Sequence, residues 1–161
     1  MAWLSVSAAF VSAVAATAMR FSDFSDVAPL KGDPAPPRIA DSAEAQEFRT
    51  DLRSKAKLGP NFSGHFTFIR IGCGTGCSKI AVIDSADGKV VFPQSLPYVH
   101  VADWWHEPIG PAYSLESSLL IVYGRAGSEE APCGVSYFNW EKTDFRLLRF
   151  EPHDCGEYKE E

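Results

Sequence analysis

Short runs of apolar, β-branched and aromatic residues alternate with turn-forming residues along most of the chain, a pattern typical of strands joined in hairpins. Two of these runs, 66–72 and 78–84, are separated by a glycine-rich connection of hairpin length. An Asp-Gly pair at 87–88 predicts a second hairpin turn. The predicted strands are 66–72, 78–84, 89–92, 119–123, 135–140 and 145–150.

One segment before the first strand has the period of an amphipathic helix. Asp41-Ser42 offers a helix N-cap, and Phe48, Leu52 and Ala56 follow on one helical face. A Gly-Pro pair then stops the segment, so the helix is predicted at 43–58. We therefore expect an α+β fold, with one N-terminal helix packed on an antiparallel sheet of five or six strands made of successive hairpins.

The N-terminal residues read as a targeting segment. Residues 2–18 carry no charge and end in Ala16-Thr17-Ala18, which predicts a signal peptide cleaved after Ala18. No Lys or Arg precedes the apolar run, and a buried helix or membrane anchor is the alternative. We expect no stable membrane anchor after cleavage. Residues 19–40 are then an irregular, Pro-rich leader, and 41–161 form a single domain.

Charge and cysteine content narrow the possible partners and compartments. The formal net charge of −6 argues against nucleic acid or an anionic membrane as partner, and it permits a basic protein. Four cysteines in an exported chain predict two disulfides, for which three pairings exist. Hairpin geometry favours Cys73–Cys77, which leaves Cys133–Cys155 by elimination. The predicted location is periplasmic or secreted.

The loop between the first two cysteines is the first candidate site. A metal pair, a redox pair and a nucleophilic cysteine are alternatives to a disulfide here. A structural zinc site would need two further ligands, and redox cysteine pairs usually begin a helix. An oxidising compartment favours the disulfide. We therefore expect Gly74, Thr75 and Gly76 to form a disulfide-shaped binding loop.

A second candidate site lies in the segment 94–117, which shows no regular period and is rich in proline and aromatic residues. Long irregular loops in small domains are often functional. Trp104 and Trp105 are the residue type that dominates interface hot spots, so we expect them, with His100, to contact a partner. The alternatives are core packing for the tryptophans and a metal or catalytic site at His100 and His106.

His65 is a candidate base at the start of the first strand. It could form the base of an active site with a Cys73 thiolate or with Asp84. Cys73, however, is eight residues later on the same strand, roughly 26 Å away at about 3.3 Å per residue, so His65 and Cys73 cannot touch unless the strand is broken. A hydrogen bond to the backbone at the strand start is the alternative that we favour.

Four motifs of glycine, cysteine and aromatic residues lie between residues 48 and 90, within a similarity that covers about residues 48–140. They are Phe48-Arg49-Thr50, Pro60-Asn61-Phe62-x-Gly64-His65-Phe66, Gly72-Cys73-Gly74-Thr75-Gly76-Cys77 and Ile83-Asp84-x-x-Asp87-Gly88-Lys89-Val90. In this combination the chain resembles a family of uncharacterised small exported bacterial proteins. The resemblance implies export and carries no activity.

A shorter similarity lies near the C-terminus. Pro152-His153-Asp154-Cys155 is similar to the tetrapeptide of the inhibitor of vertebrate lysozyme family. Those periplasmic α+β proteins insert a disulfide-pinched loop with these residues into the lysozyme cleft. That family has a second cysteine just before the tetrapeptide, where this chain has Phe150 and Glu151. The resemblance therefore indicates a class of function and assigns no residue.

These observations favour an exported, disulfide-stabilised, non-catalytic binding module for a protein partner, with inhibition of a cell-wall hydrolase as the specific expectation. No cofactor and no metal are expected. The alternatives are a small secreted hydrolase or metalloenzyme that uses His65 or the His100/His106 pair, and a structural envelope protein. The sequence leaves the partner and the oligomeric state open.

Overall fold

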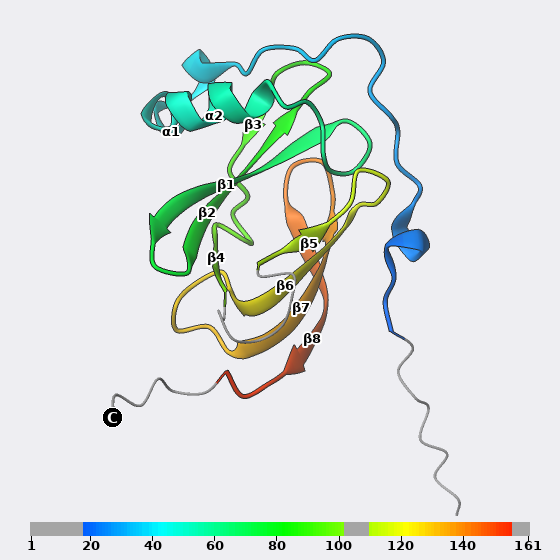
Figure 1. The fold of residues 1–161 in the computed structure, drawn as a ribbon, viewed down its shortest axis with the longest axis vertical. Helices are drawn as coiled ribbons and strands as arrows, with labels where there is room; N and C mark the ends of the chain where they lie inside the picture. The colour runs from blue at the N-terminus through cyan, green and yellow to red at the C-terminus, as the bar shows by residue number, and fades with distance from the viewer. Residues whose placement is uncertain (1–17, 102–109, 156–161) are drawn as a thin grey trace, which may run out of the picture.

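Eight antiparallel strands form one sheet, in the order β1-β2-β4-β6-β7-β8, with β3 beside β2 and β5 beside β6 (Figure 1). The structure is a computed structural model and describes residues 18–101 and 110–155. The strand bounds are β1 Phe66–Gly74, β2 Cys77–Asp84, β3 Val90–Val91, β4 Tyr98–Val101, β5 Ala112–Tyr113, β6 Leu119–Ala126, β7 Cys133–Trp140 and β8 Phe145–Pro152.

The sheet has more strands than the five or six predicted, because β4 and β5 lie in the segment that shows no period. Both strands pair with the same side of β6, at Val101 with Gly124 and at Ala112 with Ile121. Ten residues lie between Val101 and Ala112, whereas only two lie between their partners Ile121 and Gly124 on β6. β4 and β5 thus act as one strand that is interrupted by the residues between them. This interruption is why the sequence pattern predicts no strand here.

The single predicted helix is also corrected, because two short helices occupy its place. They are α1, Ala43–Glu47, and α2, Arg49–Ala56, and they meet at Phe48, whose ψ of 19° is not helical. The Phe48 ring packs against the Phe92 ring, with 6.1 Å between centroids. The chain therefore turns at Phe48 to place this ring on the sheet. Ser42 is the predicted N-cap, and its hydroxyl accepts from the Ala45 N–H.

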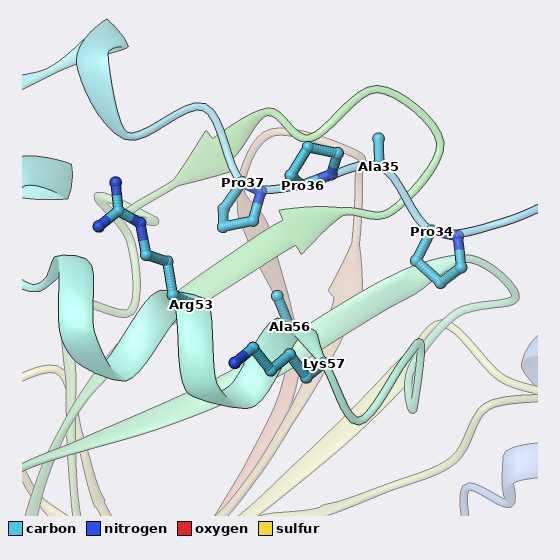
Figure 2. A pocket seen from close by; sticks show the side chains of 7 residues that line it. All are labelled: Pro34, Ala35, Pro36, Pro37, Arg53, Ala56 and Lys57. Carbon is cyan, nitrogen blue, oxygen red and sulfur yellow. The ribbon is translucent and has the colours of Figure 1, made fainter.

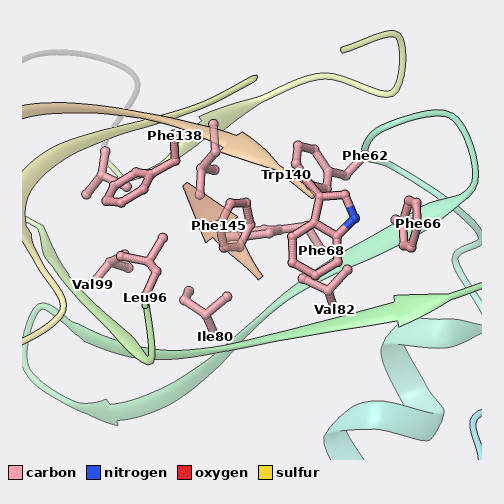
Figure 3. Close-up of a cluster of buried hydrophobic side chains, with 12 residues drawn as sticks. Phe62, Phe66, Phe68, Ile80, Val82, Leu96, Val99, Phe138, Trp140 and Phe145 are labelled. Atoms are coloured by element: carbon pink, nitrogen blue, oxygen red, sulfur yellow. The ribbon is translucent and has the colours of Figure 1, made fainter. Parts of the chain in front are cut away.

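Two apolar clusters lie on opposite faces of the sheet. Side chains from β1 and β2 meet those of β7 and β8 in the larger cluster, where Trp140 packs on Phe145 at 4.8 Å between centroids (Figure 3). The smaller cluster joins Ile69 and Ile71 of β1 to Leu52 of α2. The β1 side chains thus alternate between two buried faces, as expected for a strand covered on both sides.

The leader before α1 is irregular, as predicted, apart from two 3-10 turns at Phe21–Phe24 and Ile39–Asp41. It nevertheless runs along the domain and bonds to it (Figure 1, blue). The N–H groups of Leu30, Ala35 and Arg38 donate to carbonyls of Gly64, Ser85 and Gly88, at 3.2, 2.8 and 2.8 Å. The leader is therefore part of the folded unit.

Candidate functional site

The tip of the β1–β2 hairpin carries the predicted disulfide loop. Cys73 and Cys77 form a disulfide, with 5.2 Å between their Cα atoms. The loop is tighter than the predicted three residues, because Gly74 belongs to β1 and pairs with Cys77 after a bulge. Gly74 and Gly76 have φ values of 134° and 67°, which glycine adopts without the steric strain of other residues. The turn itself is Thr75 and Gly76.

The β1 side of this tip is open to solvent. Gly72, Cys73, Gly74 and Thr75 are all exposed. A Cβ atom built at Gly72 or Gly74 would meet nothing within 4 Å. The disulfide thus closes a small ring whose backbone is open to a partner. This ring lies at the end of a strand pair, β1 and β2, that is buried on both faces.

The sheet register places His100 directly beside this tip. Cys77 of β2 pairs with His100 of β4, His100 pairs with Arg125 of β6, and Arg125 pairs with Cys133 of β7. Side chains of directly paired residues lie on the same face of a sheet, so these four residues form one row across four strands. Two of the predicted contact regions, the glycine loop and His100, are therefore brought together. Sequence analysis missed Arg125, whose place depends on this register.

The second predicted disulfide anchors the C-terminal end of the sheet. Cys133 and Cys155 are paired with 5.8 Å between their Cα atoms, across a separation of 22 residues. The N–H of His153 also donates to the Cys133 carbonyl at 3.0 Å. The residues Pro152, His153 and Asp154 are exposed, and Cys155 ties them to β7 in place of a local ring.

Two predicted contact residues lie outside the described residues. These are Trp104 and Trp105. His106 and residues 1–17 of the predicted signal peptide 1–18 are outside them as well. His100, the third predicted contact residue of this segment, is described. It is paired across the sheet with Cys77, which follows Thr75 by two positions in the chain.

His65 lies at the entry of β1 and contacts the leader. Its Nδ1 is 2.7 Å from the Ala28 carbonyl, the predicted backbone hydrogen bond, and its Nε2 is 3.6 Å from Asp84 Oδ1. A Cβ atom at the preceding Gly64 would lie 2.2 Å from the same Ala28 carbonyl, so only glycine admits this approach. His65 and Asp84 do lie together, and His65 also bonds to the leader at Ala28.

Lys79 is a polar residue that sequence analysis missed. Its ammonium group lies 2.6 Å from Glu44 Oε1 and over the Tyr98 ring at 4.8 Å, and the rings of Phe48 and Phe92 flank it at 5.7 Å. Burial opposes the charged form, but the bonds to Glu44 and Tyr98 outweigh it and raise the pKa of Lys79. This cage fastens α1 to the sheet.

A cavity of about 620 Å³ lies between the leader and α2 (Figure 2). Pro34, Pro36 and Pro37 form one wall, and Arg53 and Lys57 project from the helix on the other. Both cations are exposed, as are Pro34 and Pro36, so the cavity is a shallow surface feature beside the leader.

The comparisons with known proteins give no identity: no protein-family model, no curated protein and no solved structure matches the chain. Within residues 18–101 and 110–155, no group of three His, Cys, Asp or Glu side chains is placed to hold a metal ion. None of the helices in the same ranges is long and apolar enough to cross a membrane. The two disulfides are typical of an oxidising, extracytoplasmic environment.

Proposed function

We propose that this protein is an exported, disulfide-stabilised, non-catalytic binding module that presents the tip of the β1–β2 hairpin to a protein partner. The observation that carries the proposal is the exposed Cys73–Cys77 ring, which is held on a rigid strand pair with His100 in the adjacent position. A loop fixed in shape before binding loses less conformational entropy when the partner orders it. This favours recognition by shape.

The specific partner that we propose is a cell-wall hydrolase, which the module inhibits. A narrow exposed tip fits a concave substrate cleft better than it fits a flat surface. The net charge of −6 favours a basic partner. The location that follows is the periplasm or the extracellular space. An enzymatic role has less support, because His65 contacts the leader and lies at the opposite end of β1 from the Cys73–Cys77 ring.

The test measures hydrolysis of isolated peptidoglycan by a panel of purified muramidases, amidases and endopeptidases, with and without this protein. We expect stoichiometric inhibition of at least one enzyme. The blocking variant is Thr75→Trp, which puts a large side chain on the exposed tip. The matched control is Thr143→Trp, at the exposed β7–β8 turn near the other end of the sheet.

The expected result is loss of inhibition in Thr75→Trp and full inhibition in Thr143→Trp. Inhibition that survives Thr75→Trp would contradict the role of the tip. No inhibition of any enzyme class would contradict the choice of hydrolases. Peptidoglycan cleavage by this protein alone would contradict the non-catalytic reading.

A further inference from the structure

A second cavity, of about 480 Å³, opens at the free edge of β1, away from the leader cavity. Lys55 of α2 and Arg70 of β1 supply its charged groups, and no Asp or Glu is among the described residues that line it. Leu58, Phe68 and Tyr113 give it apolar surface. The cavity therefore combines two cations with an apolar wall, on a protein whose net charge is −6.

Neither cation has an acidic partner in the described part of the chain. The Lys55 ammonium donates to the Arg70 carbonyl at 2.6 Å, and Arg70 Nε donates to Ser78 Oγ at 3.3 Å. Both side chains are only partly exposed. The partly buried Lys79, in contrast, is neutralised by Glu44 at 2.6 Å. Desolvating a cation without a counter-charge costs free energy, and a bound anion would recover it.

The guanidinium of Arg70 lies against Gly110 and bonds to the side chain of Ser78. A Cβ atom built at Gly110 would come within 2.6 Å of Arg70 Nη1, so the glycine lets the chain close on this group. Nε points to Ser78, which leaves the Nη atoms as the donors not accounted for by a described acceptor. A guanidinium fixed in this way binds a carboxylate with little further loss of freedom.

The remaining polar groups of the cavity restrict what can bind. The Asn61 amide is engaged at both ends by the backbone of Phe68, and the Thr67 hydroxyl bonds to Gly59 and Ser85. The groups left to meet a ligand are thus the two cations and the hydroxyls of Ser78 and Tyr113, since Ser78 Oγ only accepts from Arg70 among the described contacts. All of these can donate, which favours an acceptor-rich anion.

We propose that this cavity binds the carboxylate of a small organic acid with an apolar or aromatic body. Arg70 and Lys55 receive the carboxylate, and Leu58 and Tyr113 contact the body, because the Phe68 ring is buried beneath Tyr113. This chemistry belongs equally to a free acid and to the C-terminal carboxylate of a peptide. The site is separate from the hairpin tip, so the proposal does not depend on inhibition of a hydrolase.

The test is an NMR titration of the purified protein with five probes, read at the Gly110 and Phe68 amides and the Arg70 Nε–H. 3-Phenylpropionate represents a free acid, and N-acetylphenylalanine represents a peptide terminus. N-Acetylphenylalaninamide keeps the aromatic body of N-acetylphenylalanine but lacks its negative charge. Acetate and inorganic phosphate carry a negative charge but have no aromatic body. We expect saturable shifts with one or both aromatic acids, and the tighter of the two identifies the source.

The variants Arg70→Gln and Lys55→Gln should each weaken binding of that acid by about tenfold or more, because each removes a charged hydrogen bond. Arg53→Gln is the matched control, an exposed cation on the same helix, and should bind as the parent does. Thermal melts check that each variant folds, and Lys55→Arg, which keeps the charge, should retain binding if folding is intact.

Several outcomes would overturn the proposal. One is binding of the amide derivative as tight as that of the acid. Another is binding of acetate or phosphate as tight as that of either aromatic acid. Equal weakening in Arg53→Gln would mean diffuse attraction and no built site. Absence of saturable shifts with both aromatic acids would also overturn it. None of these results bears on inhibition through the hairpin tip. Failure of the cavity proposal is therefore distinguishable from failure of the proposed function.

Discussion

Asn61 closes the free edge of β1, and its removal should destabilise the protein by about 2 kcal/mol. The Phe68 N–H donates to Asn61 Oδ1 at 2.7 Å, and Asn61 Nδ2 donates to the Phe68 carbonyl at 3.2 Å. The amide thus takes the place of a neighbouring strand at this position. Partly buried hydrogen bonds contribute roughly 0.5–1.5 kcal/mol each, so losing two in Asn61→Ala costs about 1–3 kcal/mol.

The assay is urea unfolding followed by the fluorescence of the buried Trp140. With an m-value of roughly 2 kcal/mol/M, the midpoint should fall by about 1 M. The control is Asn139→Ala, because that side chain makes one described hydrogen bond, from the Ser118 hydroxyl. Asn61→Ala should also self-associate at high concentration, since it frees backbone groups at a sheet edge. A midpoint shift no larger than that of Asn139→Ala would refute this reasoning.

Two further predictions concern the disulfides and pH. Replacing Cys133 and Cys155 by Ser should lower the free energy of unfolding by about 3 kcal/mol on the chain-entropy scale, because the two residues are 22 positions apart. Replacing Cys73 and Cys77, which are 4 positions apart, should lower it by about 2 kcal/mol. Calorimetry should therefore show the larger fall in melting temperature for the first pair. Partial burial disfavours the charged form of Asp144. Hydrogen bonds from the side chain and backbone of Ser95 and from the backbone of Phe145 outweigh this effect and lower the pKa of Asp144. Its contribution to stability is then full above about pH 4, the ordinary value, and is lost as the pH falls through the lowered pKa. The difference in unfolding free energy between the parent and Asp144→Asn should shrink between pH 7 and pH 3, and an unchanged difference would count against this assignment.

The hairpins could be predicted from sequence because their signals are local. The glycines at 74 and 76 and the Asp-Gly pair at 87–88 fix turns between strands that are adjacent in the chain. The pairing Cys73–Cys77 follows from the same short-range geometry, and Cys133–Cys155 follows once it is fixed. The helix N-cap at Ser42 is also a local signal.

The features that could not be predicted depend on contacts between distant residues. β4 has only four residues, too few to show a period, and it is a strand because it pairs with β2 and β6 on either side. The pairing of its His100 with Cys77 and Arg125 therefore cannot be recognised from the sequence of β4 itself. The helix breaks at Phe48 because its ring meets Phe92, far along the chain. The cations at Lys55 and Arg70 look like ordinary surface charges in the sequence. Only the fold brings them to one cavity, whose described lining residues include no Asp or Glu.

The central claim is that the Cys73–Cys77 ring binds a partner through a shape fixed in advance. The most direct measurement is the dissociation constant of the hydrolase that this protein inhibits, for the parent and for Cys73→Ser/Cys77→Ser, with Cys133→Ser/Cys155→Ser as control. Freeing two or three loop residues should weaken binding by about 1–2 kcal/mol, or roughly 5–30-fold. The control, if folded at the assay temperature, should bind within about twofold of the parent. Equal affinity of the parent and the ring-opened variant would contradict the claim.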